Sequence, residues 1–225
     1  MRITLIIPVY NEEKYLGEFI KQLQRELQKL SDPCQVLFID DGSTDQTPKI
    51  LANSLIKNSI VISSPHNLGK GASMKIGFQK AQTSSDAIIF MDADLQHDPQ
   101  HIHEFIATLK DTSLVFGYRK LSEDAPFIRK LGNEIVRYVF RTLFNIRRYD
   151  LLCGFIAIRK DRFDIMHWKS KDYGVELELA MIVGKRKLPF KEILIHTIYL
   201  DTKKGLTIFD AALILIKIPF WYLLY

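Results

Sequence analysis

The first 118 residues alternate short apolar runs with longer stretches in which apolar residues recur every three or four positions. This alternation is expected when parallel strands are joined by crossover helices. Most of the runs are almost wholly apolar, as strands covered on both faces must be. The predicted strands are residues 3–8, 35–40, 60–63, 87–91 and 114–117, and the predicted helices are 13–30, 47–56, 70–81 and 101–109. The pattern predicts an α/β fold with a mostly parallel sheet flanked by helices.

Beyond residue 118 the regular alternation stops. A predicted helix at 127–146 carries apolar residues on one face and arginines on another. The other predicted elements are a strand at 151–158, a helix at 176–183 and a strand at 191–200. Residues 206–225 are almost wholly apolar. Because 225 residues can bury one sizeable core, we expect a single domain over 1–205 followed by an apolar C-terminal helix.

Charge is distributed unevenly between the two halves. Residues 1–118 carry 11 Lys and Arg against 14 Asp and Glu, whereas residues 119–225 carry 20 against 12. An acidic half joined to a basic, aromatic-rich half suits a metal site beside an anionic surface or a phosphate-bearing partner. The sequence contains no RNA- or DNA-binding motif, so we expect no nucleic acid partner.

The two cysteines and the first residues bear on the cellular compartment. Cys34 and Cys153 are far apart, which indicates neither a disulfide framework nor a paired-cysteine metal site. The apolar run that begins at Ile3 is short and is soon followed by acidic residues, unlike a secretory signal. These features predict a protein of the reducing cytoplasm.

Acidic turns follow three of the predicted strands. They are Pro8-Val-Tyr-Asn-Glu12, Asp40-Asp-Gly-Ser-Thr-Asp45 and Asp92-Ala-Asp-Leu-Gln-His97. Ligands of open parallel sheets bind beyond the carboxyl ends of the strands, so the three turns are expected to face one site. Carboxylates gathered at one edge repel each other unless a cation or hydrogen-bond donors lie among them.

Asp92 and Asp94 are the candidate cation ligands. They are two residues apart at the end of a strand, so their side chains can point the same way and share one divalent ion. Oxygen-only ligation suits Mg²⁺ or Mn²⁺, which bind substrate phosphates through one or two carboxylates. Such an ion would neutralise charge on a diphosphate leaving group. The alternative is an Asp-rich loop that caps the helix after Pro99.

The neighbouring turns favour the ligand-binding interpretation. Asp40 and Asp41 can place a carboxylate on a base or ribose edge, or they can belong to a turn that caps the next helix. Tyr10 can stack on a nucleobase or lie half-buried in the core. Asn67-Leu-Gly-Lys-Gly71 opens a helix but lacks the spacing of a phosphate-binding P-loop, which disfavours an NTPase.

Taken together, four motifs in this order and spacing resemble those of family 2 glycosyltransferases of GT-A fold. They are the three acidic turns, with Met91 before the third, and Asn67-Leu-Gly-Lys-Gly71. The resemblance is strongest to the dolichyl- or polyprenyl-phosphate sugar synthases, a branch that includes the dolichol-phosphate mannose synthases. It implies a Rossmann-like GT-A fold and inverting transfer of a sugar from a GDP- or UDP-sugar to a polyprenyl or dolichyl phosphate. Residues 1–118 would bind the nucleotide sugar and 119–205 the acceptor.

The resemblance also implies site residues, position by position. The nucleoside would be held by Pro8, Tyr10, Glu12, Asp40 and Asp41. The metal and the donor diphosphate would be bound by Asp92, Asp94 and Gln96, and the donor-binding set also includes Lys70 and Ala93. Arg119 and Arg129 would grip phosphates, for which a planar guanidinium offers bidentate hydrogen bonds.

The acceptor side matches the branch less closely. Asp150-Leu-Leu-Cys-Gly-Phe155 resembles its Asp-x-x-x-Gly-Phe stretch, which borders the acceptor, but some relatives carry Arg where Ile156 stands. Many synthases have Arg-x-x-Gly-x-Ser-Lys in a later loop, and here Thr202-Lys-Lys-Gly-Leu-Thr-Ile208 keeps only the glycine. Lys203 or Lys204 would then supply the missing charge.

The acceptor decides whether a general base is needed. A polyprenyl phosphate is already ionised and needs only positioning. A hydroxyl of a glycan or lipid would need a carboxylate base, for which Asp150, Glu176 and Glu178 are the candidates. Dense arginines and the lack of an obvious histidine base in the sequence favour the phosphate. A third alternative is an inactive nucleotide-sugar-binding membrane protein.

A lipid acceptor requires contact with a bilayer. The predicted helix at 127–146 is rich in aromatics and arginine, as interfacial helices are, and each basic residue near an anionic leaflet contributes about 1 kcal/mol. Within 206–225, Asp210, Lys217 and Pro219 interrupt the apolar run, which favours an interfacial or paired amphipathic helix over a membrane span, with a core helix as the alternative. We expect a peripheral protein on the cytoplasmic face of the membrane, with a transmembrane partner or a homo-oligomer left open.

Overall fold

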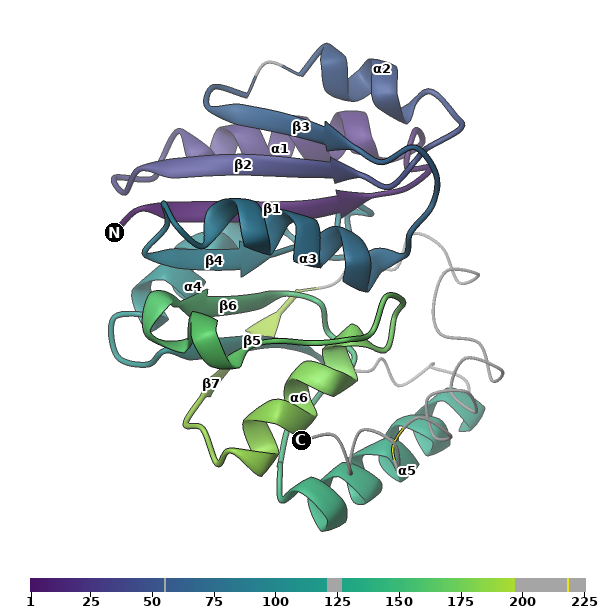
Figure 1. The fold of residues 1–225 in the computed structure, drawn as a ribbon, viewed down its shortest axis with the longest axis vertical. Helices are drawn as coiled ribbons and strands as arrows, with labels where there is room; N and C mark the ends of the chain where they lie inside the picture. The colour runs from purple at the N-terminus through teal and green to yellow at the C-terminus, as the bar shows by residue number, and fades with distance from the viewer. Residues whose placement is uncertain (55, 121–126, 197–217, 219–225) are drawn as a thin grey trace.

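The computed structural model describes residues 1–54, 56–120, 127–196 and 218, with the backbone alone for 127–133. Within these ranges the strands form one seven-stranded sheet in the order β3-β2-β1-β4-β6-β5-β7 (Figure 1). The strands are β1 (Ile3–Val9), β2 (Cys34–Asp40), β3 (Ser59–Ser63), β4 (Ala87–Phe90), β5 (Leu114–Arg119), β6 (Ile156–Arg159) and β7 (Lys191–Ile195). β6 runs antiparallel to β4 and β5, and the other paired strands are parallel. The predicted mostly parallel sheet is confirmed.

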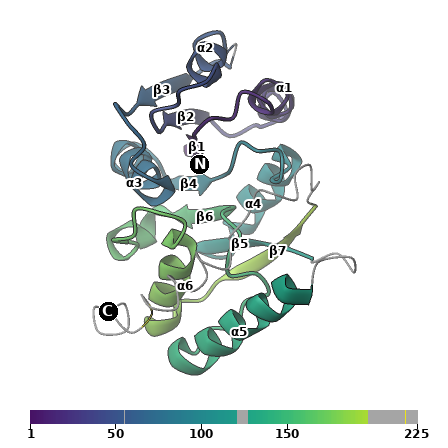
Figure 2. The same ribbon diagram turned by 90° about the vertical axis from the view of Figure 1, so that its right-hand side faces the viewer.

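Helices cover both faces of the sheet (Figure 2). They are α1 (Leu16–Leu27), α2 (Thr47–Ala52), α3 (Lys70–Ala81), α4 (Ile102–Thr108), α5 (Phe127–Phe144) and α6 (Val175–Lys185), with 3₁₀ turns η1 (Pro99–His101) and η2 (Lys160–Ile165). One core cluster joins α3, α5 and α6 to strand residues such as Ile6, and the other joins α1, α2 and α4 to neighbours such as Leu5. Successive strand residues point to opposite faces, so a continuous apolar run fills both clusters.

One predicted strand is wrong over most of its length. The apolar run at 151–158 becomes a strand only at β6, and the residues before it are irregular. The Leu152 N–H donates to Asp150 Oδ1 at 2.9 Å, so the aspartate side chain closes a local turn. Asp side chains offer the backbone such an alternative to a sheet ladder. Apolar periodicity cannot detect this turn, because its residues are apolar as well.

Most of the predictions for the end of the chain concern residues that the structure does not describe. The predicted helix at 206–225 lies outside the described residues, except for Ile218, which is buried in the same core cluster as α5 and α6. None of the described helices is both long and apolar enough to cross a membrane. The domain boundary at residue 205 stays a prediction.

Candidate active site

The first two acidic turns are bonded to each other beyond the carboxyl ends of β1 and β2, which point the same way (Figure 1). The Thr44 N–H donates to Asn11 Oδ1 at 2.8 Å, and the Asn11 N–H donates to Ser43 Oγ at 3.0 Å. Asn11 has a φ of 52°, a left-handed conformation that asparagine tolerates. Tyr10, beside it, is 42% exposed and so presents its ring to solvent. A rigid frame therefore supports the residues predicted to hold a nucleoside.

The paired aspartates at the end of β2 are buried, and both accept hydrogen bonds from backbone N–H groups. Asp40 Oδ1 accepts a hydrogen bond from the Ser43 N–H at 3.0 Å. Asp41 accepts from the Leu68 N–H at 2.9 Å through Oδ1 and from the Gly69 N–H at 2.8 Å through Oδ2. Asp41 thus holds the Asn67–Gly71 loop in place, a role that the sequence did not indicate. The predicted nucleoside contacts of Pro8, Glu12, Asp40 and Asp41 stay predictions.

Lys70, at the start of α3, lies between two carboxylates. Its Nζ is 2.7 Å from Asp92 Oδ1 and 2.7 Å from Glu176 Oε1. Burial alone would lower the pKa of Lys70, but the two carboxylates raise it above its usual value. Burial favours the neutral form of Asp92, yet Lys70 and then His97 lower the pKa of Asp92 to about 2. Lys70, Asp92 and Glu176, which we call the charged cluster, therefore contain an ammonium and an ionised aspartate in a partly water-excluded site.

Residues 168–173, which we call the strap, pack directly against the loop that carries Lys70. The Trp168 Nε1–H donates to Gly71 O at 2.9 Å, and the Ala72 N–H donates to Lys171 O at 3.1 Å. A Cβ on Gly69 or Gly71 would collide with carbonyl oxygens of the strap, so only glycine permits this approach.

Glu178 is hydrogen-bonded to the backbone of the strap and does not belong to the charged cluster. The side chain is fully buried, and its Oε1 and Oε2 accept from the N–H groups of Lys169 and Ser170 at 2.8 and 2.7 Å. Two backbone donors on one carboxylate are typical of a structural anchor. The structure therefore engages Glu178 with the protein backbone, whereas its neighbour Glu176 faces Lys70.

The Asp92-Ala-Asp-Leu-Gln-His97 turn is held by its own residues. The Asp92 N–H donates to His97 Nδ1 at 3.0 Å, and the Gln96 N–H donates to Asp94 Oδ1 at 3.0 Å. Ala93 is buried, whereas Asp92 and Asp94 are partly accessible. Among the described residues, no group of three or more His, Cys, Asp or Glu side chains is arranged to hold a metal ion. Two accessible aspartates fit Mg²⁺ or Mn²⁺ that is also bound by a diphosphate, because Mg²⁺ usually takes one or two protein carboxylates.

Arg119, at the end of β5, pairs with Asp150. Its Nε lies 2.7 Å from Asp150 Oδ2, and its backbone N–H donates to the same oxygen at 3.3 Å. Burial would raise the pKa of Asp150, but Arg119 lowers it below its usual value. Arg119 also contributes to the lowered pKa of Asp92, so it lies within electrostatic reach of the charged cluster. The side chain of Arg129, in α5, is not among those described, and its role stays a prediction.

Two residues near the cluster were not predicted. His97 is buried between the Asp92 N–H and Cys153, whose Sγ lies 3.7 Å from Nε2. Tyr173 ends the strap, and its ring centroid is 5.9 Å from Lys70 Nζ. His97 belongs to the third acidic turn, but the motif indicated no role for it. No spacing pattern indicates Tyr173, because its position depends on which distant loops meet.

Comparison with solved structures defines the class of fold. The structure superposes on glucosyl-3-phosphoglycerate synthase from Mycobacterium tuberculosis, crystallised with Mn²⁺, uridine diphosphate and phosphoglyceric acid, with a TM-score of 0.75. The match covers 98% of this chain and 78% of that one at 18% identity. The fold is therefore that of the GT-A glycosyltransferases.

The sequence gives the family. The family described as "Glycosyl transferase family 2" matches residues 4–191, and the chain belongs to it. The undecaprenyl-phosphate 4-deoxy-4-formamido-L-arabinose transferase of Salmonella choleraesuis is 30% identical over 168 residues, 73% of this chain and 51% of that protein. The dodecaprenyl-phosphate galacturonate synthase of Rhizobium johnstonii is 25% identical over 68% of this chain and 46% of that protein. The chain thus spans about half the length of the curated relatives it matches.

Proposed function

We propose that the protein is an inverting, metal-dependent glycosyltransferase that moves a sugar from a GDP- or UDP-sugar to a polyprenyl phosphate at the cytoplasmic membrane face. The observation that carries this proposal is the charged cluster beside Asp94 at the carboxyl end of the sheet, with Arg119 within electrostatic reach. The names of the relatives, which act on undecaprenyl and dodecaprenyl phosphates, support the acceptor class.

On the donor side, Asp92, Asp94 and Gln96 would hold Mg²⁺ or Mn²⁺ together with the donor diphosphate. The ion would supply charge neutralisation for the departing diphosphate. Lys70 adds a fixed positive charge 2.7 Å from Asp92. A preorganised cation in a partly desolvated site stabilises developing negative charge without reorganising at the moment of reaction.

On the acceptor side, Arg119 would bind the lipid phosphate. The bond from the anomeric carbon to the acceptor oxygen forms as the bond to the diphosphate breaks, and the bonding electrons leave with the diphosphate. A phosphate oxygen is ionised already, so no proton has to be removed. Asp150 keeps the Arg119 guanidinium oriented through the 2.7 Å ion pair, and orientation of this kind accounts for much of enzymatic rate enhancement.

A hydroxyl acceptor is the second candidate, and Glu176 is the residue that favours it. Of the three base candidates, Asp150 pairs with Arg119 and Glu178 anchors the strap. Glu176 Oε2 is buried and has no hydrogen-bond partner among the described residues. Burial raises the pKa of Glu176, which suits a proton acceptor.

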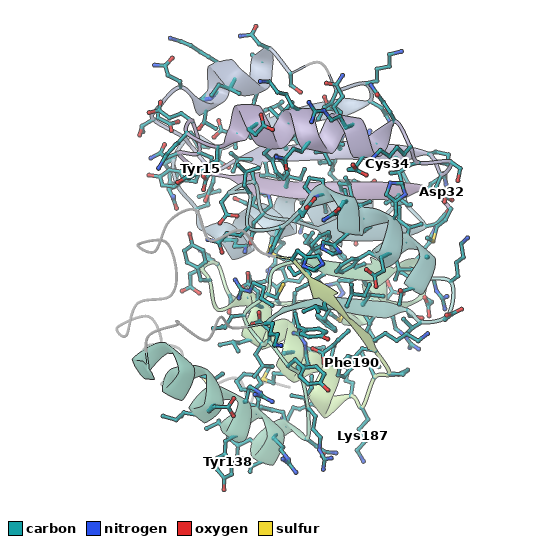
Figure 3. All side chains as sticks on the ribbon, turned by 180° about the vertical axis from the view of Figure 1, so that it is seen from behind. Tyr15, Asp32, Cys34, Tyr138, Lys187 and Phe190 are labelled. Atoms are coloured by element: carbon teal, nitrogen blue, oxygen red, sulfur yellow. The ribbon has the colours of Figure 1, made fainter. Side chains whose placement is uncertain are left out.

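The outer face of α5 supports attachment to a membrane surface. Ile135, Tyr138 and Leu143 are 45%, 71% and 49% exposed, and Arg141 is exposed beside them. Figure 3 shows Tyr138 pointing away from the rest of the molecule. Exposed apolar and basic residues on one helix are the composition of an interfacial helix.

The test is transfer in liposomes with labelled nucleotide sugars, a short polyprenyl phosphate, and Mg²⁺ or Mn²⁺. Label in the organic phase that disappears with EDTA would support the proposal. Label on a glycan hydroxyl, lost in Glu176→Gln while donor binding survives, would favour the second candidate. Metal-dependent nucleotide binding without turnover on any acceptor would indicate the inactive binder and overturn both.

A further inference from the structure

Tyr173 lies beside the charged cluster and is exposed. It is 62% exposed, and its ring centroid lies 5.9 Å from Lys70 Nζ. Partial withdrawal of the phenol from water raises the pKa of Tyr173; Lys70 opposes this rise, and Asp92, Glu176 and Glu12 add to it. These three carboxylates come from α6 and from the turns after β1 and β4. The ring therefore lies beside the charged cluster, on the side of Lys70.

The backbone that carries Tyr173 is fixed on both sides. Before it, the strap is bonded to Glu178 and to the Ala72 N–H. After it, the Gly174 N–H donates to Asp172 Oδ1 at 3.0 Å, and α6 begins at Val175. An exposed aromatic ring on a rigid support offers a large contact area at little entropic cost, which is why such rings are frequent in binding sites.

We propose that Tyr173 is a donor-binding residue whose ring packs against the sugar of the nucleotide sugar. The inference rests on the proposed function, because it places the donor diphosphate at Asp92 and Asp94. With the diphosphate there, the sugar would lie next to the charged cluster, where the exposed Tyr173 ring offers an apolar face. A sugar offers C–H groups on the faces of its ring, which suit an aromatic face, and hydroxyls at its edge, which suit Glu176.

The test separates binding of the sugar from binding of the diphosphate. Calorimetric titrations of the wild type with Mg²⁺ would compare the affinity for UDP-glucose with that for UDP, and the affinity for GDP-mannose with that for GDP. Other UDP-sugars and GDP-sugars would then be tested until one binds more tightly than its free nucleoside diphosphate. For that pair, Tyr173→Ala should weaken binding of the nucleotide sugar by about three- to tenfold, the usual value of an aromatic contact. Binding of the free diphosphate should change by less than twofold, and Tyr173→Phe should resemble the wild type.

The outcomes that overturn the inference are distinct. Equal weakening of the sugar nucleotide and the free diphosphate would assign Tyr173 to the diphosphate or to the fold, and no weakening would remove it from the site. If no nucleotide sugar binds more tightly than its free diphosphate, the inference about Tyr173 is wrong, whereas binding of the donor nucleotide is still supported. If the wild type binds no nucleotide, the proposed function falls with it. Val61→Ala, at the far sheet edge, is the control for losing exposed apolar surface.

Discussion

Glu176 and Glu178 are two residues apart on α6, yet their carboxylates have opposite surroundings. Glu178 accepts two backbone N–H groups of the strap, whereas Glu176 pairs one oxygen with Lys70 and leaves Oε2 without a hydrogen-bond partner among the described residues. Residues at this spacing point to different sides of a helix, since 3.6 residues make one turn. One glutamate therefore faces the charged cluster, and the other fixes the backbone beside it.

Glu178→Gln separates these two roles. An amide oxygen can accept one of the two N–H groups, but the amide nitrogen would face the other donor. We expect the free energy of unfolding to fall by about 1–3 kcal/mol in urea denaturation and the donor KM to rise, with transfer retained. Loss of transfer at unchanged stability would instead make Glu178 the general base. Glu18→Gln, at an exposed site on α1, should change neither quantity.

Lys70→Met removes the cation that Asp92 and Glu176 share. Removing one partner of a partly buried ion pair leaves an uncompensated charge, so we expect a loss of about 3 kcal/mol in the free energy of unfolding. Adding Glu176→Gln should restore part of this loss, because one of the two unpaired carboxylates is then neutral. No recovery in the double variant would contradict the cluster. Lys21→Met, whose side chain is 69% exposed, is the control and should have little effect.

The fold could be predicted because short, almost wholly apolar runs alternate with segments that have a helical period. The gathering of the three acidic turns at one edge of the sheet could also be predicted, because parallel strands deliver their carboxyl ends to one edge. The strand at 151–155 failed because a single Asp150 side chain redirects an apolar segment. Sequence spacing contains no signal for such a bond.

Side-chain partners were the other part that the sequence could not give. Asp41 is engaged with the Lys70 loop, and the strap reaches Gly69 and Gly71 from about 100 residues away in the chain. Such contacts depend on how α6 and its preceding loop pack onto the sheet. Only a three-dimensional structure assigns them, which is why Tyr173 and the anchor role of Glu178 were missed.

Both cysteines should be inert in the folded protein. Burial raises the pKa of Cys153 to about 12, and partial burial raises the pKa of Cys34, at the start of β2 (Figure 3), to about 12 as well. A raised thiol pKa keeps the unreactive protonated form, and at pH 8 the thiolate fraction is on the order of 10⁻⁴. We expect no iodoacetamide labelling at pH 8 by mass spectrometry, and complete labelling of both in urea. Rapid labelling of either before unfolding would contradict this burial.

Asp94→Ala should abolish metal-dependent donor turnover and leave the fold intact. The carboxylate is partly accessible, and it accepts the Gln96 N–H, so its loss should cost about 1 kcal/mol of stability. Asp98→Ala is the matched control in the same loop, because Asp98 likewise caps a backbone N–H, that of Gln100. The control should lose similar stability and keep its turnover. Unchanged turnover in Asp94→Ala would remove Asp94 from the metal site.

Gly154→Ala tests how tightly the charged cluster is packed. A Cβ at this position would lie 2.7 Å from Lys70 Nζ, 3.0 Å from Asp92 Oδ2 and 3.2 Å from Glu176 Oε1. The lysine end can shift more easily than the backbone, so we expect donor turnover to fall by tenfold or more, on the order of 1.4 kcal/mol in transition-state stabilisation. Stability should fall less than in Lys70→Met, because the three side chains of the cluster remain.

Gly17→Ala is the control for Gly154→Ala, because it adds the same methyl group at a position with free space. Nothing lies within 4 Å of a Cβ at Gly17, which is in the first turn of α1, so alanine there should stabilise the helix by about 0.5–1 kcal/mol and leave turnover unchanged. A large difference in turnover between the two substitutions, measured with the same donor and metal, would place the active centre at the Lys70–Asp92 pair. Equal turnover would mean that the space beside Gly154 is not used by the reaction, and the charged cluster would then serve the fold alone.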